Sequence, residues 1–280
     1  MSEGPPLLDL PLEDGRELSG DGLKSGCADV YAHPAVRWLL GGELHPGGTA
    51  TTLRALELIQ AGPGDRLLDV ASGDGASAIL AAQEVACEVV GVDYGARAVE
   101  GANEAAAREA PQAAIEFVRG DAESLPFADG SFDLLLCECS LCTFPDKARA
   151  VAEFGRVLRP DGRIALCDVT ADRTRLPAEL LGSMATIACV GEALPADGYL
   201  SLLRRAGLEP FAEVRRDEDA DALARRVEER LRGARLLGVE QLGIEIDAAI
   251  ALLAQAREAI AAGALGYSIF AACAPASGSV

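Results

Sequence analysis

Short apolar segments alternate with helical segments along residues 66–169, and this alternation constrains the fold more than any other feature of the chain. The apolar segments lack regular polar alternation, which indicates strands that are covered on both faces of a sheet. Strands that alternate with helices of about ten to fifteen residues predict parallel βαβ units. The expected strands are 66–70, 87–92, 115–119, 131–137 and 163–169, and the expected helices are 75–85, 96–109 and 147–158.

Two further strands, 211–215 and 265–273, complete the expected sheet. The fold predicted is α/β: a doubly wound, mostly parallel, seven-stranded, Rossmann-like sheet with N-terminal helices and a helical insertion near the C-terminus. The insertion is a helical pair, and the dense charge of its first helix predicts a solvated face. The remaining expected elements are helices 178–189 and 197–206, the helical pair 219–237 and 240–262, and a turn at 159–162.

The segment before the first strand differs in composition from the rest. Residues 1–22 are rich in Pro, Gly and acids and predict a mobile tail. Residues 31–40 and 49–61 predict two helices, the second with Thr49 as its N-cap. The expected parts are thus a tail (1–22), an N-terminal helical cover (23–62), a ligand-binding domain (63–170), and substrate-side helices, insertion and last strands of that same domain (171–280).

The charge balance excludes several classes of partner. The 280 residues include 25 Lys and Arg against 44 Asp and Glu, a formal net charge of −19. A chain this acidic gains little on a phosphate backbone or an anionic membrane surface, so we expect no nucleic-acid and no membrane partner. The uncharged run 259–276 contains Gly263 and Gly266 and predicts a helix end followed by a strand.

The chain begins without the basic and apolar segments of a secretory signal, so we expect a cytoplasmic protein. Its eight cysteines are then expected to be reduced thiols. They indicate chemistry or core packing more than disulfide bonds. The sequence leaves the oligomeric state open.

The clearest binding motif is the turn Asp69-Val-Ala-Ser-Gly-Asp-Gly75, which joins a buried strand to a helix. Glycines there allow a ligand to approach the backbone, and the helix N-terminus offers free N–H donors. Asp93 ends the next strand, where an acid typically accepts both hydroxyls of a ribose. Asp121 follows the third strand, where its carboxylate is within reach of an adenine amino group.

This series of motifs resembles the class I S-adenosylmethionine-dependent methyltransferases, including Asp121-Ala122 before Leu125-Pro-Phe127. The resemblance implies S-adenosyl-L-methionine as cofactor and makes 63–170 the domain that binds it. Ala71 departs from the family, which usually has glycine there. A dinucleotide-dependent reductase is the nearest alternative, and the block 121–127 favours the methyltransferase. The cofactor-binding residues implied are Asp69, Ala71, Ser72, Gly73, Gly75, Asp93, Tyr94, Asp121, Ala122 and Cys137.

Three cysteines, Cys137, Cys139 and Cys142, cluster at the carboxyl end of the fourth expected strand. That edge of a parallel sheet is where substrates meet a cofactor. Buried packing is the alternative, and it is favoured for Cys137, which lies within the strand. A zinc site is disfavoured, because no second Cys-x-x-Cys pair and no nearby histidine accompanies the cluster.

The residues around this cluster sharpen the interpretation. The segment from Cys139 to Pro145-Asp-Lys147 resembles the arsenite methyltransferases, as does Cys189 with its flank Gly191-Glu-Ala-Leu194. The resemblance implies that Cys139 and Cys189 bind trivalent arsenic as substrate, with Cys142 and Cys27 as further candidate ligands and a cellular thiol as partner. The chain lacks the other N-terminal cysteines of that family, and its region after 215 differs.

Two other functions remain open. An organic small molecule is the alternative methyl acceptor, with the cysteines lining its pocket, and a regulator that binds the cofactor without turnover is the third possibility. A base for an organic acceptor is scarce, since His33 and His45 are the only histidines. His45 is expected in a surface turn and Glu138 is expected to be solvated. Tyr31 and Trp38 are expected to pack on adenine or on the N-terminal helix, and Cys87, Cys167 and Cys273 are expected in the core.

Overall fold

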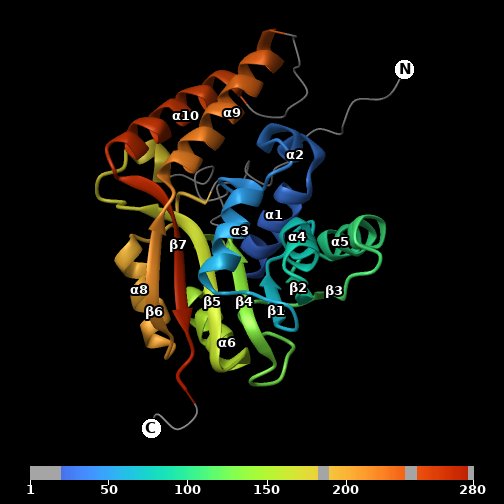
Figure 1. Cartoon of the computed structure of the whole chain (residues 1–280). Coiled ribbons are helices and arrows are strands. Elements are labelled where there is room, and N and C mark those ends of the chain that lie inside the picture. The colour runs from blue at the N-terminus through green and yellow to red at the C-terminus, as the bar shows by residue number, and fades with distance from the viewer. Residues whose placement is uncertain (1–19, 182–188, 237–244, 277–280) are drawn as a thin grey trace.

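A computed structural model describes residues 20–181, 189–236 and 245–276. They form one seven-stranded sheet in the order β3-β2-β1-β4-β5-β7-β6 (Figure 1). Strands β3 to β5 run parallel, whereas β7 pairs antiparallel with both β5 and β6. The predicted α/β sheet is confirmed. Its strands are β1 (Arg66–Val70), β2 (Glu88–Asp93), β3 (Ile115–Arg119), β4 (Phe132–Glu138), β5 (Leu158–Ala171), β6 (Glu209–Arg215) and β7 (Leu265–Cys273).

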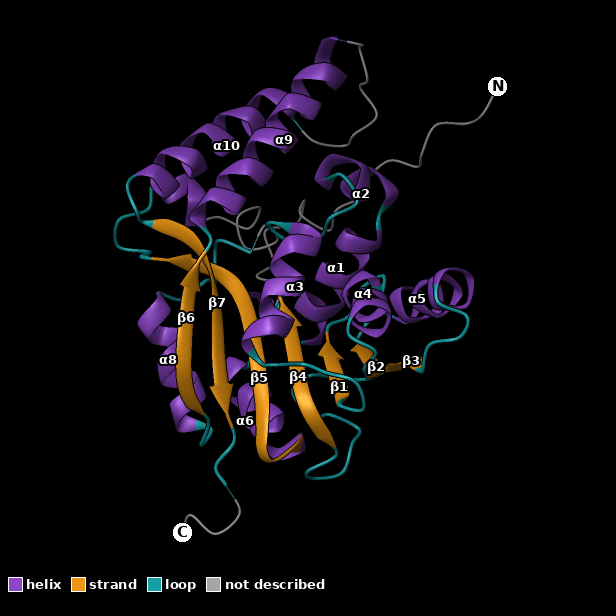
Figure 2. Cartoon of the chain, in the orientation of Figure 1, coloured by secondary structure: helices purple, strands orange, loops and turns teal. Residues whose placement is uncertain are grey.

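Helices cover both faces of the sheet (Figure 2). On one face, α3, α4 and α5 pack with the inner end of α10, and on the other face α6 and α8 pack. This explains why the central strands are buried throughout and lack polar alternation. The helices are α1 (Asp21–Ala32), α2 (Pro34–Leu40), α3 (Gly48–Leu58), α4 (Ala76–Glu84), α5 (Ala96–Glu109), α6 (Lys147–Val157), α8 (Ala196–Arg205), α9 (Asp217–Leu236) and α10 (Ile246–Ala261), with short 3-10 helices η1 (Leu141–Thr143) and η2 (Ala178–Leu181).

The N-terminal cover is larger than the sequence predicted. Helix α1 begins at Asp21, inside the expected tail, and residues 1–19 of that tail lie outside the described residues. Thr49 is not an N-cap: α3 begins one residue earlier, after Gly47 in the left-handed region at φ 78°. A Cβ atom at Gly47 would lie 2.1 Å from Thr51 Oγ1, so the turn requires glycine.

Two other expected elements differ. The expected turn at 159–162 is an irregular stretch inside β5, where the register with β4 shifts and Asp161 adopts φ 62°. Of the expected helix 178–189, Ala178–Leu181 forms a 3-10 turn and Cys189 lies in a turn, while residues 182–188 lie outside the described part. The uncharged run 259–276 contains the end of α10 and all of β7, as predicted.

The helical pair α9–α10 is inserted between β6 and β7 and stands at the end of the sheet, beside α2 (Figure 1). Its charged helix is not solvated all round. Arg226 forms an ion pair with Glu43, and Arg230 donates to the backbone oxygen of Trp38 in α2. Leu231 packs in a small core with α2 and α10. Among the described helices, none is long and apolar enough to cross a membrane.

Candidate functional site

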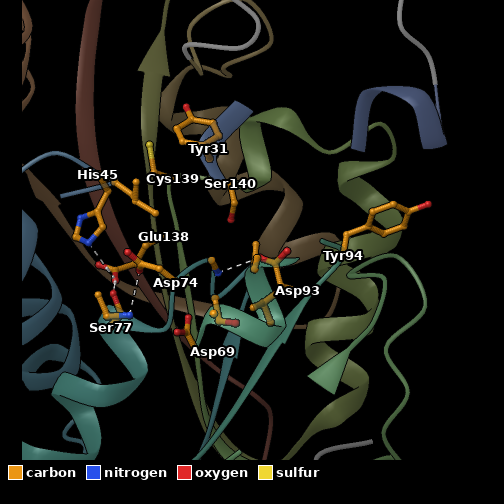
Figure 3. Close-up of a pocket in the computed structure, with 18 of the residues that line it drawn as sticks. Tyr31, His45, Asp69, Asp74, Ser77, Asp93, Tyr94, Glu138, Cys139 and Ser140 are labelled. Atoms are coloured by element: carbon orange, nitrogen blue, oxygen red, sulfur yellow. Dashed lines mark hydrogen bonds and ion pairs between the residues drawn. The ribbon is translucent and has the colours of Figure 1, made fainter. Parts of the chain in front are cut away.

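A pocket of about 1380 Å³ opens at the carboxyl ends of β1, β2 and β4. Its walls come from the turns after these strands, from α4, and from the N-terminal elements α1 to α3 (Figure 3). In an open parallel sheet this crevice is the general ligand site, because the strand order reverses there. Ten of the site residues expected from sequence line it: Cys27, Asp69, Ala71, Ser72, Gly73, Asp93, Tyr94, Asp121, Ala122 and Cys139.

The turn after β1 has the conformation that a close backbone approach requires. Ala71 adopts φ 57° and Gly73 φ 55°. Ala71 therefore occupies a left-handed position at which a glycine would be less strained. Gly75, at φ 82°, is not among the pocket-lining residues. A Cβ atom there would lie 2.6 Å from Phe117 Cζ, so packing of α4 on the sheet requires this glycine.

Asp93 is fixed by backbone amides. The N–H groups of Gly73 and Gly95 donate to its two carboxylate oxygens at 2.9 and 2.8 Å. Burial raises the pKa of Asp93, while these two hydrogen bonds oppose the rise. Each oxygen retains a lone pair, so the carboxylate can accept the two hydroxyls of a ribose in a fixed direction.

The third expected acid, Asp121, already has a partner. Lys24 of α1 donates to both of its oxygens, at 3.0 and 2.8 Å, and to Glu123 at 2.8 Å. Lys24 and Arg119 also lie near the ring of Tyr94, each 5.9 Å from its centroid. An adenine at this end of the pocket would therefore share Asp121 with a lysine that the sequence did not indicate.

Glu138 and His45 depart from their expected environments. The Glu138 side chain is 5% exposed and lies 3.6 Å from His45 Nε2, so it is not solvated. It accepts a hydrogen bond from Ser77 Oγ at 2.6 Å (Figure 3) and another from Thr52 Oγ1 at 3.0 Å. His45 lines the pocket instead of standing in a surface turn. Sequence reasoning missed Thr52 and Ser77, because each hydroxyl acquires its role only through folding.

Four cysteines gather where the pocket meets η1, and we call Cys27, Cys139, Cys142 and Cys189 the thiol cluster. The thiols of Cys139 and Cys142 both hydrogen bond to the sulfur of Cys189, although Cys189 is distant in sequence. Cys27 is close enough for the charge of Cys189 to raise its pKa. Cys27 and Cys139 line the pocket, whereas Cys142 and Cys189 lie behind them and are buried.

The cysteines of the thiol cluster differ in their pKa values. The pKa of Cys189 lies well below that of an ordinary thiol, because Cys139, Cys142 and Tyr31 donate hydrogen bonds to its sulfur. The pKa of Cys139 is raised by its hydrogen bond to Cys189 and by burial. Cys189 is therefore the cysteine of the cluster that loses its proton most readily. Tyr31 Oη lies 3.3 Å from Cys189 Sγ, which places Tyr31 at the cluster and not on adenine.

The backbone at both key cysteines is strained. Cys139 adopts φ 48° and Cys189 φ 64°, a region that side chains other than glycine rarely occupy. Such conformations persist only when surrounding contacts impose them, and they concentrate at functional sites. The N–H of Cys139 donates to the carbonyl oxygen of Cys167 at 2.7 Å, and the N–H of nearby Cys142 donates to buried Asp168 at 2.9 Å. Burial raises the pKa of Asp168 to about 7.

Three of the other four cysteines belong to the core. Cys137 is fully buried, hydrogen bonds to Ser140 Oγ at 3.2 Å and is not among the pocket-lining residues, so the structure does not support cofactor contact by Cys137. Cys87 and Cys167 are buried, as expected, while Cys273 is partly exposed. Trp38 is half-exposed against Arg230 and away from the pocket. Within the described ranges, no His, Cys, Asp and Glu residues form a group suited to a resident metal ion.

Comparison with known proteins agrees with this architecture. The methyltransferase domain family matches residues 68–166. The 27-O-demethylrifamycin SV methyltransferase of Amycolatopsis mediterranei is 35% identical over 60% of this chain and 62% of its own length. An arsenite methyltransferase of Aquipseudomonas alcaligenes is 35% identical over 72% of this chain and 60% of its own length. A demethylmenaquinone methyltransferase of Mycobacterium sp. strain KMS is 32% identical over 60% of this chain and 67% of its own length.

This chain belongs to the class I S-adenosylmethionine-dependent methyltransferases. It spans 60 to 67% of the length of these three relatives. Two solved structures share the fold. The [4+2]-cyclase SpnF has a TM-score of 0.73 and 23% sequence identity, and the match covers 87% of this chain and 93% of that chain. Phosphoethanolamine N-methyltransferase 2 of Haemonchus contortus, in complex with S-adenosyl-L-methionine, has a TM-score of 0.73 and 20% identity, and the match covers 86% of this chain and 56% of that chain.

The residues of this methyltransferase fit its cofactor, S-adenosyl-L-methionine. One carboxylate oxygen of Asp69 is buried without a hydrogen-bond partner among the described residues. Burial raises the pKa of Asp69 well above the usual range, with Glu138 and Asp93 contributing through their charges. A buried acid among other acids is unfavourable unless a cation approaches. The cofactor carries positive charge and, in its ribose, the hydroxyls that Asp93 is oriented to accept.

Proposed function

We propose that this protein transfers a methyl group from S-adenosylmethionine to trivalent arsenic held by the thiol cluster. The observation that carries the proposal is that Cys27 and Cys139 lie at the wall of the cofactor pocket and that buried Cys189 contacts Cys139. These cysteines come from α1, from the end of β4 and from the segment after β5. Trivalent arsenic is thiophilic, and soft thiolates are the ligands that such an ion selects.

The cysteines act as ligands in this mechanism. Cys189 supplies the first thiolate, because it is the thiol of the cluster whose pKa is lowered. Cys139 and Cys27 complete a pyramid around arsenic, and since both line the pocket, the arsenic lone pair faces it. Cys142 is a further ligand candidate within reach of Cys189. Bound S-adenosylmethionine would supply an electrophilic methyl group on a sulfonium.

A base is not needed for this acceptor. Arsenic held by thiolates carries no proton that must leave, so rate enhancement comes from holding two reactants in line in a site from which water is excluded. This suits a pocket in which His45 and Glu138 are already tied to each other and to Thr52. A cellular thiol such as glutathione would deliver arsenic by thiol exchange, in which the leaving thiols take up the protons of the cysteines. Methyl transfer to the arsenic lone pair would release S-adenosylhomocysteine and raise arsenic from the trivalent to the pentavalent state. Two equivalents of the cellular thiol would then reduce the methylated arsenic to the trivalent state and become a disulfide.

Methylation of an organic small molecule is the second candidate. The relative that methylates 27-O-demethylrifamycin SV matches this chain at the same identity as the arsenite methyltransferase. The buried pair His45 and Glu138 also places a histidine on the pocket wall, where a hydroxyl acceptor would need a base. In this alternative the cysteines line the acceptor site without binding an ion.

An arsenite titration of methyl transfer separates the two candidates. The assay combines the purified protein, isotopically labelled S-adenosylmethionine, glutathione and increasing arsenite, and measures labelled methylarsenicals by chromatography. We expect turnover that depends on arsenite and saturates. Absence of any labelled arsenical, with S-adenosylhomocysteine still bound by the protein, would reject the arsenic proposal.

A further inference from the structure

Seven carboxylates line the pocket, and three of them, Asp69, Asp93 and Glu138, form no ion pair with a lysine or arginine among the described residues. Asp74 forms an ion pair with Arg37 at 2.6 Å, and Asp93 is held by two backbone amides. Across the described ranges, neither Asp69 nor Glu138 has a lysine or arginine within ion-pair distance. Their nearest basic group is His45, which lies 3.6 Å from Glu138. The floor of the pocket thus carries excess negative charge.

Glu138 is oriented by residues from three elements. Ser77 of α4 donates to Oε2 at 2.6 Å, Thr52 of α3 donates at 3.0 Å, and His45 precedes α3. Two hydroxyl donors leave further lone pairs on the carboxylate, since each oxygen accepts two hydrogen bonds. The side chains of Glu138 and Asp69 both appear in the wall of the pocket in Figure 3. A ligand entering the pocket meets two acceptors with capacity to spare.

Buried charge without a partner is strongly unfavourable, so these two carboxylates favour a cation that also donates hydrogen bonds. The cofactor has two positive groups. Its sulfonium has no N–H or O–H to donate, whereas the α-ammonium of its methionine end has three N–H donors. Asp69 retains an oxygen with no partner among the described residues, and that oxygen needs a donor. The donor requirement selects the ammonium.

We propose that Glu138, together with Asp69, binds the α-ammonium group of the methionine end of the cofactor, and that Thr52, Ser77 and His45 position Glu138 for this contact. The inference rests on the cofactor and not on arsenic as acceptor. It assigns the N-terminal cover a role in cofactor recognition, since Thr52 and His45 lie outside the β-strand turns that contact the nucleoside in this fold.

Two ligands that differ only at the methionine end test this proposal. S-adenosylhomocysteine carries the amino-acid end, whereas 5′-methylthioadenosine keeps the nucleoside and the sulfur but lacks the ammonium. Calorimetry on Glu138→Gln should show about ten- to hundred-fold weaker binding of S-adenosylhomocysteine, because one hydrogen bond to a charged group is lost. Binding of 5′-methylthioadenosine should stay within about twofold of the wild type.

Matched variants exclude a merely structural role. Asp93→Ala should weaken both ligands, because both contain the ribose. Thr52→Val, which removes the hydroxyl that donates to Glu138, should weaken S-adenosylhomocysteine selectively, and Thr52→Ser should restore it. Circular dichroism melts check that each variant folds, and the Thr52 pair carries the test if Glu138→Gln does not fold. Unchanged affinity for S-adenosylhomocysteine, or an equal loss for both ligands, would overturn the proposal. Neither measurement includes arsenite, so the arsenic proposal can fail independently.

Discussion

The cofactor pocket and the thiol cluster lie side by side but are built in different ways. The nucleoside end of the pocket uses turns directly after consecutive strands, and Asp93 is held by amides of neighbouring turns at Gly73 and Gly95. The thiol cluster has no such local frame. Its central contact joins Cys189 to Cys139, 50 residues away, and Tyr31 reaches Cys189 across 158 residues.

This difference predicts how each region responds to change. Asp93 is fixed by backbone groups that any sequence supplies in those turns, so its substitution removes one ligand contact and little else. The thiol cluster depends on three distant segments arriving together, and its hydrogen bonds tune one thiolate. Helix α1 belongs to both regions, since Lys24 contacts Asp121 and Cys27 belongs to the cluster. Substitutions confined to one region should therefore leave the other intact.

The largest expected effect is in the thiol cluster. Cys139→Ser and Cys189→Ser should each lower arsenite methylation by about hundredfold or more, because a serine hydroxyl stays protonated and is a hard ligand for a soft ion. Binding of S-adenosylhomocysteine, measured by calorimetry, should be unchanged. If both variants kept wild-type arsenite turnover, the arsenic proposal would be rejected and the organic acceptor favoured.

The reciprocal change is in the pocket. Asp93→Ala should weaken S-adenosylhomocysteine about ten- to hundred-fold, because it removes a charged acceptor for the ribose. Arsenite binding to the thiol cluster, titrated separately without cofactor, should stay the same. Equal affinity for S-adenosylhomocysteine in the variant and the wild type would contradict the ribose assignment.

A smaller effect is expected from Tyr31→Phe, which removes one hydrogen bond to Cys189. That bond helps to keep the pKa of Cys189 low, so its loss should raise this pKa. The fraction of thiolate at a given pH then falls, and the acid limb of the pH–rate profile should move upward by about one pH unit or less. A profile that superimposes on the wild type would show that Tyr31 does not tune the thiolate.

The smallest effect serves as the control for cysteine chemistry. Cys87 is buried in the core and its thiol lies 3.5 Å from the carbonyl oxygen of Gly62, to which a serine can also donate. Cys87→Ser should lower the free energy of unfolding by about 1 kcal/mol in a urea titration, through loss of apolar packing. Both cofactor affinity and arsenite turnover should remain at wild-type values. Loss of turnover here would show that serine substitutions disturb the site indirectly.

Local patterns in the sequence determined the sheet and the nucleoside end of the site. Apolar runs predicted β1 and β7 at their observed bounds, because strand burial is visible in composition. The acids Asp69, Asp93 and Asp121 lie at or just after the carboxyl ends of parallel strands, which must meet at one edge, so their proximity follows from topology. Ala71, which adopts φ 57°, also stood out in the sequence, because the family usually has glycine at this position.

Tertiary packing decided everything that depends on residues far apart in the chain. It buried Glu138 against Thr52, 86 residues away, although the sequence suggested a solvated acid. In the folded chain Tyr31 contacts Cys189 of the thiol cluster, and Gly75 and Cys137 pack in the interior. A periodic pattern reports which face of an element is buried, but not which element from elsewhere in the chain covers it. The pKa values of the cysteines and the partners of Glu138 depend on that covering element, and so only the folded chain determines them.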